Sequence, residues 1–299
     1  MTAQATLLDG KALAEIVRNE VRAGAAAFQS RRGRPPGLDV ILVGEDPASL
    51  VYTRSKERVS NELGIRGRHH HLPATTSEAD LLGQVARLNA DDSTDGILVQ
   101  LPLPNGIDAS RVVAAVDPSK DVDGLHPTNA GLLASGKAAL VPSTPVGCLR
   151  LIRSSGVELR GARALVVGRS ALVGRPTAQL LLAADATVTQ AHSQTPLEQL
   201  AELCRAADVL VVAVGKPGLI RGQWVKPGAV VIDVGATRID SGVDPVTGKP
   251  KVRTLGDVEF DAARARARAI TPVPGGVGPM TIACLMQNVL EAALLRTGS

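Results

Sequence analysis

The sequence predicts an α/β protein with two domains, in which parallel β-sheets are covered by helices. Its 299 residues suit two domains at about 150 residues each. Hydrophobic residues make up 44% and charged residues 21%, enough apolar material for a buried core. With one Trp, one Tyr and two Phe, that core must consist of aliphatic side chains, which is typical of buried parallel strands.

The first part of the chain alternates helices with strands. Asp9 caps a helix whose apolar residues recur at helical spacing until Gly33. Next come an expected strand at 38–43, a helix from 46 to 64, an extended stretch, a helix at 78–90, a strand at 96–100 and a helix at 109–116. This alternation predicts a first domain at 1–141, with a C-terminal helix, 279–297, packing back on it.

The second part, 142–278, repeats the alternation. The expected elements are helices at 145–154, 176–184 and 197–206, strands at 164–167, 187–189, 209–214 and 229–234, and a hairpin-like excursion at 240–251 that precedes residues 271–274. Several short apolar strands separated by helices predict a mostly parallel sheet.

The overall charge and the cysteines limit the function classes. A net charge of +4 without a long basic run suits an anionic small molecule, and we expect no nucleic-acid partner. Three distant cysteines, Cys148, Cys204 and Cys284, favour a reduced, cytoplasmic location. The first ten residues lack an export signal, and the apolar run at 209–214 is too short to span a membrane.

A lysine lies on the apolar stripe of the helix that follows Asp46. Tyr52, Lys56, Val59 and Leu63 are spaced four, three and four residues apart, so they share one helix face. Burial would lower the pKa of the Lys56 amine and make it available as a base, with the Tyr52 hydroxyl in reach of a substrate. The alternative is a lysine that only extends its amine to water.

Two polar sites follow the predicted strands of the first domain. Gln100 ends an apolar strand, where α/β sheets bind ligands, although it could simply satisfy a loop carbonyl. Asp121 and Asp123 have no third ligand at metal-binding spacing, so no metal site is expected. One carboxylate suffices to bind the amino-pyrimidine edge of a ligand through two hydrogen bonds.

A glycine-containing turn, Gly168–Gly174, follows a strand and opens a helix. Ser170 replaces the second glycine of the common dinucleotide fingerprint, but the helix N-terminus still offers N–H groups to a phosphate. The next strand ends at 191–194 without the acidic residue that NAD sites use for the ribose. Ser193 and Arg169 could instead bind a 2′-phosphate, which favours NADP over NAD.

Two further segments are conspicuous. The loop at 272–281 contains three glycines among prolines, so its backbone can approach a flat ligand closely. His69, His70 and His71 alternate direction in an extended segment, so at most two share a face and metal binding is not expected.

Five motifs, in this order, resemble the methylenetetrahydrofolate dehydrogenase/cyclohydrolase family. They are 44–49 with Tyr52 and Lys56, 96–104, 120–124 with His126 and Pro127, 168–176, and 272–280. The resemblance extends from about residue 8 to 290. It implies two domains flanking a cleft, the second a Rossmann-like NADP-binding domain with a mostly parallel sheet.

The resemblance also implies roles for individual residues. Lys56 would catalyse a hydrolytic step, Tyr52 and Gln100 would lie beside it, and Asp123 would bind the pterin. The substrate would also meet Pro274, Gly275, Gly276 and Val277. NADP would be bound by Gly168, Arg169, Ser170, Val173, Gly174, Ser193 and Ala236, the last smaller than the aliphatic residue common in the family.

The implied activity has two steps and uses no metal. With NADP, 5,10-methylenetetrahydrofolate is oxidised to 5,10-methenyltetrahydrofolate, which water converts to 10-formyltetrahydrofolate. The implied assembly is a homodimer, without a membrane partner. Two alternatives stay open, another two-domain NADP oxidoreductase of the shikimate dehydrogenase type and a non-catalytic NADP-binding protein, but neither explains Tyr52, Lys56, Gln100 and Asp123 together.

Overall fold

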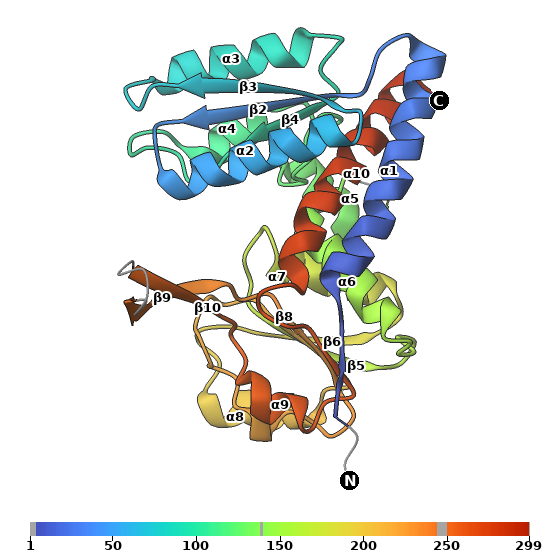
Figure 1. Cartoon of the computed structure of the whole chain (residues 1–299), viewed down its shortest axis with the longest axis vertical. Coiled ribbons are helices and arrows are strands. Elements are labelled where there is room, and N and C mark those ends of the chain that lie inside the picture. Colours follow the sequence, from blue (N-terminus) through green and yellow to red (C-terminus); the bar gives the residue numbers. More distant parts are fainter. Residues whose placement is uncertain (1–3, 138–139, 244–249, 299) are drawn as a thin grey trace. The chain divides into compact units, whose positions relative to one another are not determined.

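The computed structural model of the chain describes residues 4–137, 140–243 and 250–298 (Figure 1). The contacts divide the chain into two compact units, each built from two segments. Unit 1 comprises Met1–Leu13 and Thr144–Thr281, and unit 2 comprises Ala14–Ser143 and Ile282–Ser299. The predicted α/β class is confirmed. The predicted domain limits, 1–141 with the C-terminal helix 279–297 and 142–278, stay a prediction.

Unit 2 is built on a three-stranded parallel sheet in the order β3-β2-β4. Its strands are β2 (Gly37–Val43), β3 (Arg66–Leu72) and β4 (Gly96–Val99), and its connecting helices are α2 (Pro47–Glu62), α3 (Glu78–Ala90), α4 (Ala109–Ala115) and α5 (Pro127–Ala134). All residues of the central strand β2 are buried. Figure 1 shows α2 and α3 on opposite sides of β2 and β3, so each side of the sheet has its own apolar layer.

Two long helices belong largely to unit 2, α1 (Gly10–Arg32) and α10 (Val277–Thr297). Phe28 of α1 packs with Leu290 and Ala293 of α10. By length and composition α10 could cross a membrane, which the sequence analysis overlooked when it considered only 209–214. However, 61% of its most apolar window is buried within the protein, as in the core helix of a globular domain.

Unit 1 contains a six-stranded parallel sheet in the order β1-β11-β8-β7-β5-β6. The strands are β1 (Thr6–Leu7), β5 (Arg163–Val167), β6 (Thr187–Ala191), β7 (Val209–Val212), β8 (Val230–Asp233) and β11 (Ala269–Ile270). The helical elements are α6 (Ser143–Ser154), α7 (Gly174–Ala183), α8 (Leu197–Ala206), η1 (Gly222–Trp224) and α9 (Phe260–Arg264). The central strands are Val- and Leu-rich and buried, as expected of parallel strands covered on both faces.

The predicted hairpin is present as β9 (Thr237–Val243) and β10 (Pro250–Leu255), and residues 244–249 lie outside the described part. Residues 271–274 form no strand, because β11 ends just before them. Helix α5 and strand β1 were not predicted from the sequence. Strand β1 pairs with β11, more than 260 positions later, through Thr6 and Ala269, so no local pattern could reveal it.

Candidate active site

Lys56 is presented by α2 from its middle turn. Asp46 caps the helix, because its Oδ2 accepts a 2.8 Å hydrogen bond from the Ser49 N–H. Val59 and Leu63 follow Lys56 on the predicted stripe, and each is only 1% exposed. The Lys56 side chain is therefore directed along an apolar surface and is itself only partly accessible.

Gln100 holds the amine of Lys56. Lys56 Nζ donates a 2.9 Å hydrogen bond to Gln100 Oε1, while Gln100 Nε2 donates a 2.8 Å bond to the Leu101 carbonyl oxygen. The backbone N–H of Gln100 also donates to the Ile41 carbonyl oxygen at 2.9 Å, which ties it to the end of β2. Because its amide nitrogen is engaged, Gln100 can offer only its oxygen to Lys56, and the orientation of the pair is fixed.

Two opposite charges interact at this position. Burial lowers the pKa of Lys56, and the negative charge of Asp123 opposes that shift. Burial raises the pKa of Asp123, the Lys56 charge lowers it, and the charge of Asp121 raises it further. Asp123 keeps some accessible surface, yet it is surrounded by protein atoms deeply enough for desolvation to dominate. Burial therefore disfavours the charged form of both groups, and their mutual attraction opposes that effect.

The neighbours of Asp123 in sequence serve the fold instead. Lys120 Nζ donates hydrogen bonds to the carbonyl oxygens of Leu88, Asn89 and Asp91 at 3.0, 2.7 and 2.9 Å. Asp121 Oδ2 accepts from the His126 N–H at 2.7 Å and from Asn129 Nδ2 at 2.9 Å.

Asp123 differs from these neighbours, because it makes no hydrogen bond to another residue in the described part of the chain. Of the two aspartates, only Asp123 has a carboxylate available to a ligand.

The three consecutive histidines separate as an extended strand requires. His70 faces α3, where Nε2 lies 2.7 Å from Asp39 Oδ1 and Gln84 Nε2 lies 3.2 Å from its Nδ1. His69 lies near Glu57 of α2, and His71 contacts the Gly44 carbonyl oxygen. Within residues 4–137, 140–243 and 250–298, no three His, Cys, Asp or Glu side chains are placed to hold a metal ion.

In unit 1, the turn after β5 is shaped by a glycine. Gly168 has φ +130°, and a β-carbon at this position would lie 2.3 Å from the Ala213 carbonyl oxygen. Gln190, near the end of β6, donates from Nε2 to the Gly168 carbonyl oxygen at 2.9 Å. The turn thus passes directly over the end of the sheet, where a larger residue would displace it.

The same turn leads into α7, and Ser170 satisfies the first backbone N–H groups of that helix. Ser170 Oγ accepts from the N–H groups of Val173 and Gly174 at 3.2 and 3.3 Å, so its hydroxyl stabilises the turn. Arg169 and Arg175 are exposed on either side. The expectation that the start of α7 offers free N–H groups to a phosphate is therefore wrong, because these groups bond within the turn. The exposed guanidinium groups beside a turn that excludes a β-carbon still suit a nucleotide phosphate.

The end of β6 carries no acidic residue. Ala191 is buried, the His192 N–H donates a 3.0 Å hydrogen bond to Thr195 Oγ1, and Ser193 is exposed. Because Ser193 is exposed and no acidic residue follows β6, the end of this strand can accommodate a phosphate on the ribose of the cofactor. Ala236, just after β8, is also exposed.

The glycine-rich loop before α10 packs closely on the start of α1. A β-carbon on Gly10 would lie 1.6 Å from the Gly276 carbonyl oxygen, and the Gly276 N–H donates to the Pro272 carbonyl oxygen at 2.9 Å. Pro274 is exposed, whereas Val277 is buried as the first residue of α10. The loop is held by backbone contacts, and its proline tip faces outward.

Two family models together match most of the chain. Residues 8–123 match the catalytic domain of tetrahydrofolate dehydrogenase/cyclohydrolase, and residues 142–297 match its NAD(P)-binding domain. The chain belongs to this family.

Related proteins agree along nearly the whole length. The bifunctional protein FolD of Sorangium cellulosum is 62% identical and covers 98% of both chains. Bifunctional protein FolD 2 of Paracoccus denitrificans is 54% identical over 98% of this chain and 94% of its own. A solved structure of the Trypanosoma brucei methylenetetrahydrofolate dehydrogenase-cyclohydrolase, complexed with NADP and an inhibitor, has a TM-score of 0.92 at 41% identity, covering 99% of this chain and 100% of its own.

The residues that the family resemblance singled out fall into two sets. Lys56, Gln100 and Asp123 belong to unit 2 and interact there. The backbone of Tyr52 lies in α2, but its side chain lies outside the described part. The residues expected at NADP, and the loop 274–277, belong to unit 1.

The sequence analysis overlooked supporting residues in both units. Gln190 holds the Gly168 carbonyl, and Glu57 approaches His69 beside Lys56. Buried Asn288 of α10 donates to the backbone next to Asp123. A polar residue within the apolar pattern of α10 was the only sequence signal for Asn288.

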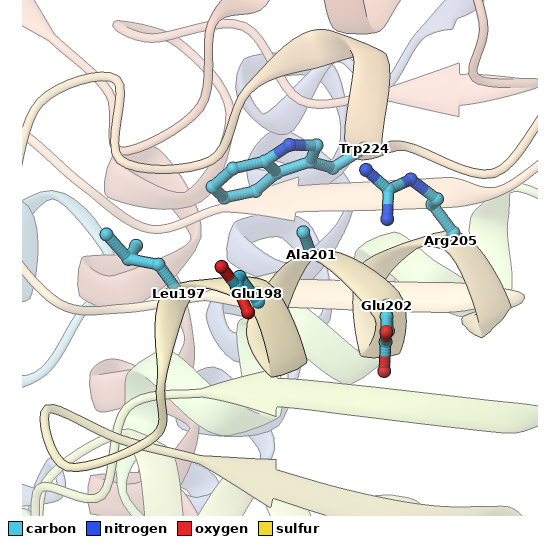
Figure 2. A pocket seen from close by; sticks show the side chains of 6 residues that line it. All are labelled: Leu197, Glu198, Ala201, Glu202, Arg205 and Trp224. Atoms are coloured by element: carbon cyan, nitrogen blue, oxygen red, sulfur yellow. The ribbon is translucent and has the colours of Figure 1, made fainter.

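A surface depression of ≈ 440 Å³ lies on unit 1, apart from the predicted site residues. Figure 2 shows its lining, with the indole of Trp224 above Ala201 of α8. The other lining residues are Leu197, Glu198, Glu202 and Arg205. None of them is a residue that the sequence analysis selected, and nothing in the structure indicates an occupant.

Proposed function

We propose that this chain oxidises 5,10-methylenetetrahydrofolate with NADP and hydrolyses the resulting 5,10-methenyltetrahydrofolate to 10-formyltetrahydrofolate. Membership of the bifunctional family supports both activities. The observation that carries the proposal is the hydrogen bond from the partly buried Lys56 amine to Gln100, beside the carboxylate of Asp123. An alternative NADP enzyme has no evident use for this arrangement.

Lys56 acts as the base of the hydrolytic step. Burial lowers its pKa, and a cationic substrate disfavours the ammonium form further, so the amine can accept a proton from the attacking water. The new C–O bond forms as that water loses its proton. The C–N5 bond then breaks as the carbinol hydroxyl loses its proton, a proton reaches N5, and the formyl carbonyl forms.

Gln100 and Asp123 position the reactants. The Gln100 oxygen keeps Lys56 Nζ from swinging into water, because its own amide nitrogen is committed to the Leu101 carbonyl. Asp123 accepts two hydrogen bonds from the amino-pyrimidine edge of the pterin. In this proposal Tyr52 and the residues Pro274–Val277 also contact the substrate.

Bound NADP would supply the hydride acceptor for oxidation of the one-carbon bridge of the folate. Gly168, Ser170, Val173 and Gly174 provide the turn for its phosphates, supported by the excluded β-carbon at Gly168. Arg169 and Ser193 bind the 2′-phosphate, and Ala236 packs against the cofactor.

We also propose a cytoplasmic homodimer that binds neither nucleic acid nor membranes. The edge strand β3 supports self-association, since β3 pairs with β2 and with no other strand of the described chain. The modest net charge of +4 supports the absence of a nucleic-acid partner. Sedimentation of the purified protein, with and without RNA and vesicles, tests these points.

Purified protein with 5,10-methylenetetrahydrofolate and NADP tests the central proposal. We expect NADPH absorbance to rise, with the methenyl chromophore appearing transiently and then decaying. If neither NADP nor NAD yields a methenyl signal, the dehydrogenase assignment is wrong.

A Lys56→Met variant separates the two steps. The apolar side chain keeps the packing but removes the amine, so we expect hydrolysis to fall by about two orders of magnitude or more. NADP binding, measured by fluorescence titration, should persist because its residues belong to unit 1. Near-normal hydrolysis by this variant would refute the role of Lys56.

A further inference from the structure

His69 lies beside Lys56 on the face of the sheet that α2 covers. A β-carbon on Gly67 of β3 would lie 2.5 Å from Ser60 Oγ of α2, which fixes the strand against the helix at that point. Two residues along a strand span about 6.6 Å, and four residues of helix span about 6 Å. Helix α2 runs antiparallel to the strands that it connects. Two residues forward along β3, from Gly67 to His69, therefore correspond to four residues back along α2, from Ser60 to Lys56. This places His69 next to Lys56.

The contacts of His69 agree with this placement. His69 Nε2 lies 3.7 Å from Oε2 of Glu57, which is the residue after Lys56. This nitrogen of His69 is buried and has no hydrogen-bond partner among the described residues. Buried polar nitrogens of this kind are uncommon and call for an explanation. An ion pair with Glu57 would satisfy Nε2 once the ring becomes protonated.

Three charged or titratable groups act on this imidazole, namely Glu57, His70 and Lys56. Burial lowers the pKa of His69, the Glu57 charge opposes the shift, and positive charge on His70 or Lys56 lowers the pKa further. His70 points to the opposite face, toward Asp39, and Asp123 acts on Lys56. The ring is therefore neutral near pH 7, and among these groups only Glu57 favours its protonated form.

Hydrolysis of a methenyl cation to a neutral formyl product releases one proton per turnover. Lys56 takes this proton from water and must lose it before the next cycle. Gln100 contributes only an amide oxygen to the amine, and in the proposed function Asp123 is occupied by substrate. Exposure increases away from the amine, from 21% for the His69 side chain to 46% for that of Glu57.

We propose that His69 and Glu57 form the proton exit of Lys56, an inference that rests on the proposed hydrolytic function. The N–H bond of the Lys56 ammonium breaks and an N–H bond forms on the unprotonated nitrogen of His69, directly or through water. Glu57 stabilises the imidazolium until a buffer base in solution removes the proton. No oxidant or further reactant is needed.

The test uses His69→Gln, which keeps a polar side chain but cannot carry a proton. Hydrolysis is followed by decay of the methenyl chromophore at saturating substrate, with the uncatalysed rate in the same buffer subtracted. At low buffer concentration we expect kcat to fall by about tenfold or more with little change in KM. Added imidazole should restore kcat, since a soluble base replaces the missing carrier.

Two further variants keep the test decisive. Glu57→Gln preserves shape on a half-exposed side chain and should show a smaller, imidazole-sensitive loss of kcat. His70→Gln removes an imidazole from the same strand but from the opposite face, and its kcat should not depend on buffer concentration. Circular dichroism and urea unfolding establish that each variant is folded.

The outcomes distinguish a failure of the proposed proton exit from a failure of the proposed hydrolytic function. If the unmodified protein does not hydrolyse the methenyl substrate at all, the proposed function fails and the proton exit with it. If that protein is active and folded His69→Gln matches it at low buffer concentration, the exit alone is wrong. A loss of kcat that imidazole does not restore assigns His69 a structural role and also overturns the exit.

Discussion

The side chain of Asn288 donates a 2.9 Å hydrogen bond from Nδ2 to the backbone carbonyl oxygen of Val122, the residue immediately before Asp123. The same nitrogen donates to the Val141 carbonyl oxygen at 2.8 Å. Asn288 lies in α10, more than 160 residues further along the chain, and is only 5% exposed. One buried amide therefore fixes the backbone from which the Asp123 carboxylate projects.

Asn288→Leu should destabilise unit 2 and displace Asp123. The variant leaves two buried carbonyl groups without a donor, so we expect the free energy of unfolding to fall by about 2 kcal/mol. We also expect the KM for methylenetetrahydrofolate to rise. Urea unfolding and steady-state kinetics measure the two effects. Asn19→Leu, at an exposed position of α1, is the control and should change neither quantity.

The pH dependence of hydrolysis should move in opposite directions in two variants. Hydrolysis needs neutral Lys56, so kcat rises as pH increases through the pKa of Lys56. Gln100→Glu places a carboxylate where an amide oxygen now lies 2.9 Å from Lys56 Nζ. The negative charge favours the ammonium form of Lys56, so the increase in kcat should move to higher pH by about one unit or more. Asp123→Asn removes the charge that favours the ammonium, so the rise moves to lower pH.

The kcat profile at saturating substrate is the relevant measurement, because Asp123→Asn also weakens substrate binding. Gln84→Glu is the control, since it adds a carboxylate facing His70 on the other side of the sheet. Its profile should coincide with that of the unmodified protein. Shifts of the same sign in both site variants would show that Lys56 does not set the pH dependence.

Local patterns were sufficient to predict α2 and its lysine. The capping residue Asp46 and the apolar spacing through Val59 and Leu63 are properties of adjacent turns, and the helix forms where they predict it. The same holds for Gln100, which ends a strand whose apolar run and following prolines are visible in sequence.

Features set by distant segments could not be predicted. The position of His69 beside Lys56 depends on how β3 is placed along α2, and the histidine run alone suggested only a metal site to be dismissed. The bond from Asn288 exists because α10 returns to the segment before Asp123. The sequence analysis also weighed Asp121 with Asp123, whereas the contacts of Asp121 with His126 and Asn129 give it a structural role.

Gly168→Ala should impair NADP use more than hydrolysis. The added β-carbon would meet the Ala213 carbonyl oxygen at 2.3 Å, so the turn over the sheet must move away from its present position. We expect the KM for NADP to rise by about tenfold or more, corresponding to about 1.4 kcal/mol of lost binding. Hydrolysis, whose proposed base Lys56 belongs to unit 2, should change little.

The matched control for this variant is Gly161→Ala. Gly161 also has a positive φ, +73°, but no atom lies within 4 Å of a β-carbon there. It therefore carries the cost of backbone strain without displacing the turn, and its KM for NADP should stay normal. Equal effects of the two substitutions on that KM would mean that general strain, not the phosphate turn, weakens cofactor binding.

Ser193→Asp should reverse the cofactor preference. A carboxylate at the end of β6 repels the 2′-phosphate of NADP and can accept hydrogen bonds from the ribose hydroxyls of NAD. Losing a charge-assisted contact costs about 1.5–3 kcal/mol, so we expect kcat/KM for NADP to fall by about ten- to a hundredfold while that for NAD rises. Thr187→Asp adds the same charge at the exposed opposite end of β6 and should leave the ratio unchanged. If both substitutions lower NADP use equally, the effect is one of overall charge, and Ser193 does not contact the phosphate.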